Sequence, residues 1–142
     1  MKLILISFFF IPYFSFTQQI IEVQNKADYP FLLSLPEQVI LDSIPPILIF
    51  LHGRSLSGNN LNLVRKYGII DAIESGRKIP AIVIAPQVNF GSSWEPSKIL
   101  SVLEYVQENY KTDKNRVYVA GMSLGAYGTT YFAGQASAVK KN

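Results

Sequence analysis

The sequence of 142 residues contains no cysteine and a single histidine, His52. Without cysteine the chain forms no disulfide bond, no thiolate zinc site, no cysteine nucleophile and no cysteine-linked lipid anchor. With one imidazole it cannot build a metal site from several histidines, and we expect no metal and no other cofactor. A serine nucleophile needs a base, and the chain offers only one imidazole for that task.

Charged residues are also scarce. They make up 16% of the chain, against 49% hydrophobic residues, and the formal net charge is +3. This composition is typical of a globular protein, and the length predicts one domain. Lysine and arginine are scattered and form no basic stripe with interleaved aromatic residues. We therefore expect no nucleic-acid partner.

The N-terminal segment has the composition of a targeting signal. Lys2 precedes an almost wholly apolar run over residues 3–16, and a serine and a threonine stand at the end of the segment. The run is short for a membrane span and is interrupted by Pro12. We predict that residues 1–17 are a signal peptide and that residues 18–142 form the domain. The protein would then be secreted or periplasmic, with no stable membrane span after cleavage; an uncleaved N-terminal anchor is the alternative.

The rest of the chain alternates between strand-length apolar runs and helical patterns. Two leading strands are expected at 20–24 and 29–35, then strands at 46–51, 80–85 and 117–120, with helices at 59–75, 97–110 and from 124 to about 133. Gly68 lies within the first of these helices and weakens it. Alternation of this kind predicts an α/β fold, with a mostly parallel sheet and flanking helices.

The last predicted strand leads into Gly121-Met-Ser-Leu-Gly125, which fits the pattern G-x-S-x-G. Between a buried strand and a helix, this pattern is typical of a nucleophile elbow, a tight turn that presents a serine hydroxyl above the sheet. A side chain at either flanking glycine, Gly121 or Gly125, would collide with the neighbouring strand or helix. The first turn of the helix after Ser123 offers unpaired N–H groups to a developing oxyanion.

His52-Gly53-Arg54 directly follows the strand predicted at 46–51. Ligands of open α/β sheets bind beyond the carboxyl ends of the strands, so this loop should lie near Ser123. Gly53 allows close approach of the backbone, and we expect His52 to organise the loop rather than act as the base. Trp94 follows the next strand and is interpreted equally well as lining a substrate cleft or as a packed aromatic residue.

Three blocks together resemble one family. They are IFLHG at residues 49–53, IAPQ at 84–87 followed by Trp94, and DKNRVYVAGMSLGAYG at 113–128. In order and spacing they resemble the N-terminal half of secreted α/β-hydrolases of the esterase and predicted-peptidase type, close to the carboxylesterase/phospholipase and feruloyl-esterase-like groups. The resemblance implies Ser123 as nucleophile, the N–H groups of Arg54 and Leu124 as an oxyanion hole, and a small-molecule ester or peptide as substrate.

The sequence departs from that family after the elbow. In this fold the acid and the histidine of the triad follow the serine along the chain, yet no Asp, Glu or His follows Ser123. We therefore expect this chain to be a fragment, truncated after the helix that follows the elbow, with a central strand left at an exposed edge. Alone it would be inactive or very weakly active.

Three functional hypotheses remain open. The favoured one is an acyl-transfer hydrolase, acting on carboxylic esters before peptides, that uses Ser123 with a base and an acid from elsewhere. The second is a non-catalytic secreted binding module on a hydrolase half-fold, which the lack of a histidine after Ser123 motivates. The third is a serine hydrolase that uses His52 as its base from an unusual position.

Overall fold

A computed structural model describes residues 18–37 and 44–139 of the chain. Residues 1–17, for which a signal peptide is predicted, lie outside the described residues. Within those two ranges, no helix has both the length and the apolar character that crossing a bilayer requires.

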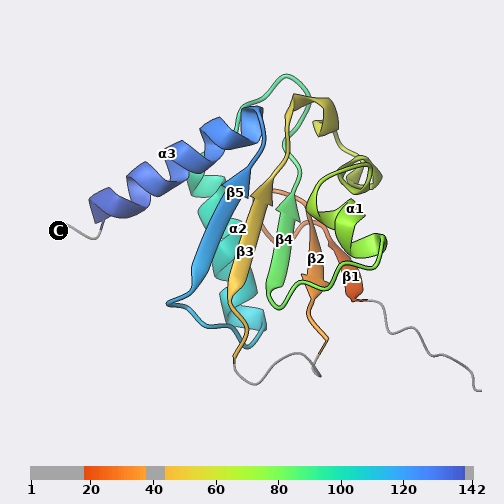
Figure 1. Cartoon of the computed structure of the whole chain (residues 1–142). Coiled ribbons are helices and arrows are strands. Elements are labelled where there is room, and N and C mark those ends of the chain that lie inside the picture. Colours follow the sequence, from red (N-terminus) through yellow and green to blue (C-terminus); the bar gives the residue numbers. More distant parts are fainter. Residues whose placement is uncertain (1–17, 38–43, 140–142) are drawn as a thin grey trace, which may run out of the picture.

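The elements alternate along the chain much as the apolar pattern predicts (Figure 1). They are β1 (Gln19–Val23), β2 (Phe31–Leu35), β3 (Ile47–Leu51), the 3₁₀ turns η2 (Arg54–Leu56) and η3 (Leu61–Arg65), α1 (Ile69–Glu74), β4 (Ile82–Pro86), α2 (Pro96–Asn109), β5 (Val117–Gly121) and α3 (Leu124–Val139). The strands are short apolar runs, and α2 begins with proline at its first turn, where a missing N–H costs nothing.

The strands form one five-stranded sheet in the order β1-β2-β4-β3-β5. β3 is parallel to both β4 and β5, whereas β2 is antiparallel to both β4 and β1. β1 consequently runs in the same direction as β3, β4 and β5, so β2 alone is reversed. The prediction of a mostly parallel sheet is confirmed. The carboxyl ends of β3, β4 and β5 share one edge of the sheet.

Helices cover both faces of the sheet. One core contains the buried face of α2 and Phe132 of α3, packed against residues such as Phe31, Ile49 and Ile84. The other core joins η3 and α1 to the opposite face, through Leu61, Val64, Ile70 and Ile73. Figure 1 shows α2 behind the sheet and α1 on the other side, so the fold has three layers.

The structure corrects two helix boundaries. The helix predicted at 59–75 is divided into η3 and the short α1, because Gly68 adopts φ = +91° between them. A Cβ at Gly68 would lie 2.9 Å from the Phe50 ring, so this glycine lets the chain pass close to β3. The helix after the elbow continues to Val139 rather than ending near Ala133. Gly134 does not end it, since glycine weakens a helix without forbidding it.

β5 is the outer strand of the sheet in the described part of the chain, next to β3. It is less buried than the other parallel strands, and the side chain of Tyr118 is 56% exposed. The edge that was expected from the sequence is therefore present among the described residues. Its carboxyl end carries the elbow.

Candidate functional site

Three loops meet at the carboxyl edge of the parallel strands. The loop after β3 begins with His52, the loop after β4 begins with Gln87, and the turn after β5 holds Ser123. Backbone hydrogen bonds connect them: the Met122 N–H donates to the Leu51 carbonyl oxygen at 3.1 Å. The predicted proximity of the β3 loop and the elbow is therefore present in the structure.

Ser123 occupies a strained and exposed turn. Its φ is +53°, in the left-handed region, and among the described non-glycine residues only Asn25 shares a positive φ. The turn closes through two bonds at 2.9 Å, from the Gly125 N–H to Met122 and from the Ala126 N–H to Ser123 itself. Ser123 is exposed, and no side chain of the described residues hydrogen-bonds to its hydroxyl. A strained serine presented to solvent in this way is a candidate nucleophile.

The two glycines that flank the elbow are sterically required. A Cβ at Gly125 would overlap the backbone of Leu51 and lie 2.9 Å from the His52 carbonyl oxygen. A Cβ at Gly121 would overlap the backbone of Gly125 and lie 2.8 Å from Thr129 Oγ1. Both collisions are with groups of the sheet or of α3 that cannot easily move. The clash expected from the motif is therefore a feature of this structure.

Gly53 brings the β3 loop against the elbow. A Cβ at this position would lie 3.5 Å from Ser123 Cβ and 3.4 Å from the Met122 carbonyl oxygen. Arg54 follows at the start of η2, and Leu124 follows Ser123 at the start of α3. Within the described ranges, the N–H of neither Arg54 nor Leu124 donates to a protein acceptor. Two backbone donors without a protein acceptor among the described residues thus directly follow Gly53 and Ser123, whose backbones leave little more than the space of one methyl group between them.

His52 is fully buried, and both of its ring nitrogens are bonded. Nδ1 lies 2.7 Å from the Gly53 carbonyl oxygen, and Nε2 accepts from the Val88 N–H at 3.3 Å. These partners require the neutral tautomer with its proton on Nδ1. Burial lowers the pKa of His52 below its ordinary value of 6.5. With both nitrogens engaged, His52 has no free nitrogen to take a proton from Ser123, and this geometry argues against the hypothesis of a His52 base.

Trp94 is a packed aromatic residue and does not line an open cleft. Its side chain is 6% exposed, and its Nε1–H donates to the His52 carbonyl oxygen at 3.3 Å. The ring makes edge-on contacts with His52 and Tyr29, at centroid distances of 4.9 and 5.3 Å. On another side it packs against Gly128 of α3. Of the two interpretations of Trp94, the structure therefore agrees with the packed aromatic residue.

Solved structures share this arrangement. A thermostable esterase is 25% identical, and the match covers 78% of this chain and 36% of that chain, with a TM-score of 0.57. A ferulic acid esterase is 16% identical over 86% of this chain and 57% of its own, with a TM-score of 0.60. An α/β serine hydrolase without a lid, from Xanthomonas campestris, is 19% identical over 89% and 60%, with a TM-score of 0.51.

The chain has an α/β-hydrolase fold. It spans between 36% and 60% of the length of these three structures. No protein-family model matches the sequence, and no curated protein matches it. The α/β-hydrolase assignment therefore depends on the arrangement of the strands, the helices and the elbow.

Gln87 is the residue of this α/β-hydrolase site that we did not predict individually. It is fully buried, and its side-chain amide donates to the carbonyl oxygens of Leu56 and Asn60, at 2.8 and 3.0 Å. The signal in the sequence was a polar residue directly after a buried apolar strand. That signal gives the position of Gln87 but not its partners, which lie on another loop.

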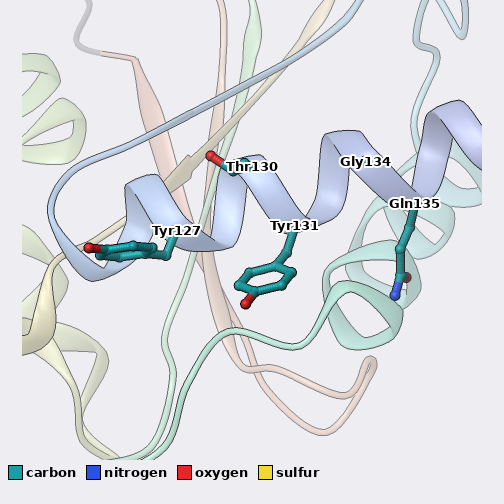
Figure 2. Close-up of a pocket in the computed structure, with 5 residues that line it drawn as sticks. All are labelled: Tyr127, Thr130, Tyr131, Gly134 and Gln135. Carbon is teal, nitrogen blue, oxygen red and sulfur yellow. The ribbon is translucent and has the colours of Figure 1, made fainter.

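A shallow groove lies on α3, beyond the elbow of the hydrolase fold. Figure 2 shows Tyr127, Tyr131 and Gln135 following one another along one side of the helix, with Thr130 and Gly134 completing the lining. The lining includes neither Ser123 nor the β3 loop. In the described part of the chain, no three His, Cys, Asp or Glu residues cluster closely enough to hold a metal ion.

Proposed function

We propose that the protein is a serine hydrolase of the acyl-transfer type that acts on carboxylic esters. The observation that carries this proposal is Ser123, exposed at φ = +53° between two obligatory glycines and close to Gly53 of the β3 loop. In this proposal Ser123 Oγ attacks the ester carbonyl carbon, and the N–H groups of Arg54 and Leu124 stabilise the oxyanion. A base takes the hydroxyl proton of Ser123 as the bond to carbon forms and gives it to the departing alkoxide, which leaves as an alcohol; water then attacks the acyl carbon, releases the carboxylic acid and restores the Ser123 hydroxyl.

Backbone donors are the main contribution of this chain to that reaction. Removing one donor from an oxyanion hole typically lowers kcat by about 10²–10³-fold. The N–H groups of Arg54 and Leu124 suit the role because each is unpaired and sits at the first residue of a helical turn. The elbow and the β3 loop are held by hydrogen bonds, so the donors are oriented before substrate arrives.

The proton acceptor must come from outside the described residues in this proposal. His52 has both ring nitrogens bonded, and the hydroxyl of Ser123 has no side-chain partner among those residues. An oxyanion hole and substrate binding alone retain about 10³–10⁴-fold acceleration over water when triad residues are removed. We therefore propose that residues 18–142 by themselves react weakly and that full activity needs a further base and acid.

Esters are the better substrate class for such a site. An alkoxide leaves more readily than an amide nitrogen, which needs a proton from a general acid as the bond breaks. Among the described residues, no acidic side chain hydrogen-bonds to the Ser123 hydroxyl. The neighbours named as esterases support the same choice. Peptide hydrolysis is the alternative.

Covalent labelling tests the nucleophile directly. The full chain is incubated with a fluorophosphonate probe, and the modified peptide is identified by mass spectrometry; the control is Ser123→Ala. We expect slow labelling at Ser123 that disappears in the control. Hydrolysis of a p-nitrophenyl ester, but not of the matched p-nitroanilide, would separate esterase from peptidase. A Ser123 that is labelled no faster than other exposed serines would contradict the proposal.

The single, fully engaged histidine favours one alternative, a secreted binding module that retains the hydrolase half-fold without catalysis. Specific binding of an ester-bearing glycan by a chain with unreactive Ser123 would support it. We also propose export, because residues 1–17 have the composition of a signal peptide. A mature protein that begins at Gln18 when sequenced from the N-terminus would agree with export.

A further inference from the structure

Gln87 connects the β4 end of the sheet to the loop after β3. Its side chain is fully buried and makes two hydrogen bonds to that loop, one to Leu56 at the end of η2 and one to Asn60. Its own N–H donates to the Pro30 carbonyl oxygen at 2.9 Å, which fixes its backbone to the start of β2. The loop is therefore attached to a rigid strand through one side chain.

Val88 adds backbone bonds beside it. The Gly58 N–H donates to the Val88 carbonyl oxygen at 2.9 Å, and the Val88 N–H donates to the His52 ring. These contacts hold the two ends of the loop, near His52 and Gly58. Between those ends, the Gln87 side chain bonds the 3₁₀ turn η2 itself.

The geometry points to Gln87 as a positioning residue for the oxyanion donor of Arg54, an inference that rests on the proposed function. η2 is one tight turn in which the Leu56 N–H bonds the Gly53 carbonyl oxygen at 3.1 Å. A displacement of Leu56 is therefore transmitted to Gly53 and Arg54. Gln87 holds the Leu56 carbonyl at 2.8 Å and so fixes the position of the Arg54 N–H within the turn. An error of about 1 Å in such a donor can lower a rate about 10²-fold.

The test replaces Gln87 with methionine, which has a similar volume but cannot donate. The matched control is Tyr29→Phe. Tyr29 is also buried, and its hydroxyl also makes two bonds to the backbone of one loop, at Ser93 and Glu95, but it makes no hydrogen bond to the β3 loop among the described residues. Both variants of the full chain are assayed with a fluorophosphonate, whose phosphoryl oxygen takes the place of the oxyanion. The rate at saturation and the probe affinity are measured separately.

We expect the saturating labelling rate of Gln87→Met to fall at least about tenfold, with the probe affinity changed less than about twofold. Tyr29→Phe should keep the wild-type rate. Gln87→Asn keeps the amide but is one methylene too short to reach both carbonyls, and it should fall between the two. It also serves if Gln87→Met does not fold. A folded Gln87→Met that is labelled at the wild-type rate overturns the inference.

Hydrogen exchange separates this inference from the proposed function. The amides of Leu56 and Ser57, which close η2, should exchange faster in Gln87→Met and at the wild-type rate in Tyr29→Phe. If wild-type Ser123 is not labelled at all, the proposed function fails. Unchanged exchange at η2 in Gln87→Met would then overturn the positioning role as well, because the loop would not depend on Gln87.

Discussion

Ser123 shows how one residue stores strain where the chemistry is proposed to happen. Its φ of +53° is a conformation that glycine adopts freely, whereas a residue with a Cβ pays about 1–2 kcal/mol for it. The surrounding bonds at Met122, Gly125 and Ala126 keep the turn in place despite this cost. The strained turn presents Ser123 to solvent at the carboxyl edge of the sheet.

This strain makes a prediction about stability that is independent of activity. We expect Ser123→Gly to be more stable than Ser123→Ala by about 1 kcal/mol, because only glycine relieves the left-handed φ. Both variants remove the hydroxyl, so that loss cancels in the comparison. Urea unfolding followed by circular dichroism gives the two free energies. Equal stabilities would show that the turn is not strained at this position.

The residues of the elbow could be predicted from the sequence, and the bonds of Gln87 could not. The pattern G-x-S-x-G specifies Ser123 and its glycines within five consecutive residues, where sterics act locally. Gln87 bonds to carbonyls that lie 31 and 27 residues away along the chain. A glutamine can donate to any backbone carbonyl, so only the folded arrangement of β3 and β4 identifies its partners.

At the scale of elements, α3 is placed by a close contact with the loop after β4. Gly128 lies against Trp94 so tightly that a Cβ there would come within 2.7 Å of its side chain. Trp94 also donates to the carbonyl oxygen of His52 in the β3 loop. One indole therefore contacts both α3, which begins at the proposed donor Leu124, and the loop that carries Arg54.

Two glycines of α3 give opposite predictions. Gly128→Ala should destabilise the fold by about 1–2 kcal/mol, because overpacking against Trp94 exceeds the helix-propensity gain of alanine. Gly134→Ala should stabilise it by about 0.5–1 kcal/mol, because nothing lies within 4 Å of the added methyl group. Trp94 is the single tryptophan, so its fluorescence during urea unfolding reports both. Equal effects of the two substitutions would contradict this placement of α3.

The positions of the strands were easier to predict than the course of the chain between β3 and β4. Apolar runs defined β3, β4 and β5 to within two residues at each end, since burial in the sheet selects them directly. Residues 59–75 carry a helical pattern but form η3 and α1, because the chain must bend at Gly68 around Phe50. Phe50 lies 18 residues before Gly68 in the sequence, and periodicity does not reveal their contact.

For the molecule as a whole, His52 lies where the sheet, the β3 loop and the α2 side of the fold meet. It is fully buried, its ring contacts Trp94, and its nitrogens bond Gly53 and Val88. The neutral ring satisfies these partners, whereas a second ring proton on Nε2 would face the Val88 N–H. Protonation of His52 should therefore weaken its contacts with the β3 loop at Gly53 and with the β4 loop at Val88.

Global stability should fall when the pH drops below about 6.5. Burial lowers the pKa of His52 in the folded chain, so the unfolded chain binds a proton at a pH where the folded chain does not. The stability that His52 contributes is present above pH 6.5 and is lost between that value and its lowered pKa, with a slope of at most about 1.4 kcal/mol per pH unit. The pKa values of Tyr29 and Lys98 are raised above 10, and a hydrogen bond from Arg116 lowers that of Asp113, so these three groups titrate outside this range.

The check is urea unfolding of the wild type and of His52→Gln at several pH values between 5 and 8. Glutamine accepts and donates hydrogen bonds but does not titrate, so the variant should lose the fall in stability that begins near pH 6.5. It should be less stable than the wild type at pH 8, and the two curves should converge as the pH decreases. If the free energies of unfolding of the two proteins changed with pH in parallel, the pKa of His52 would be the same in the folded and unfolded chains. The loss of stability at low pH would then have another cause.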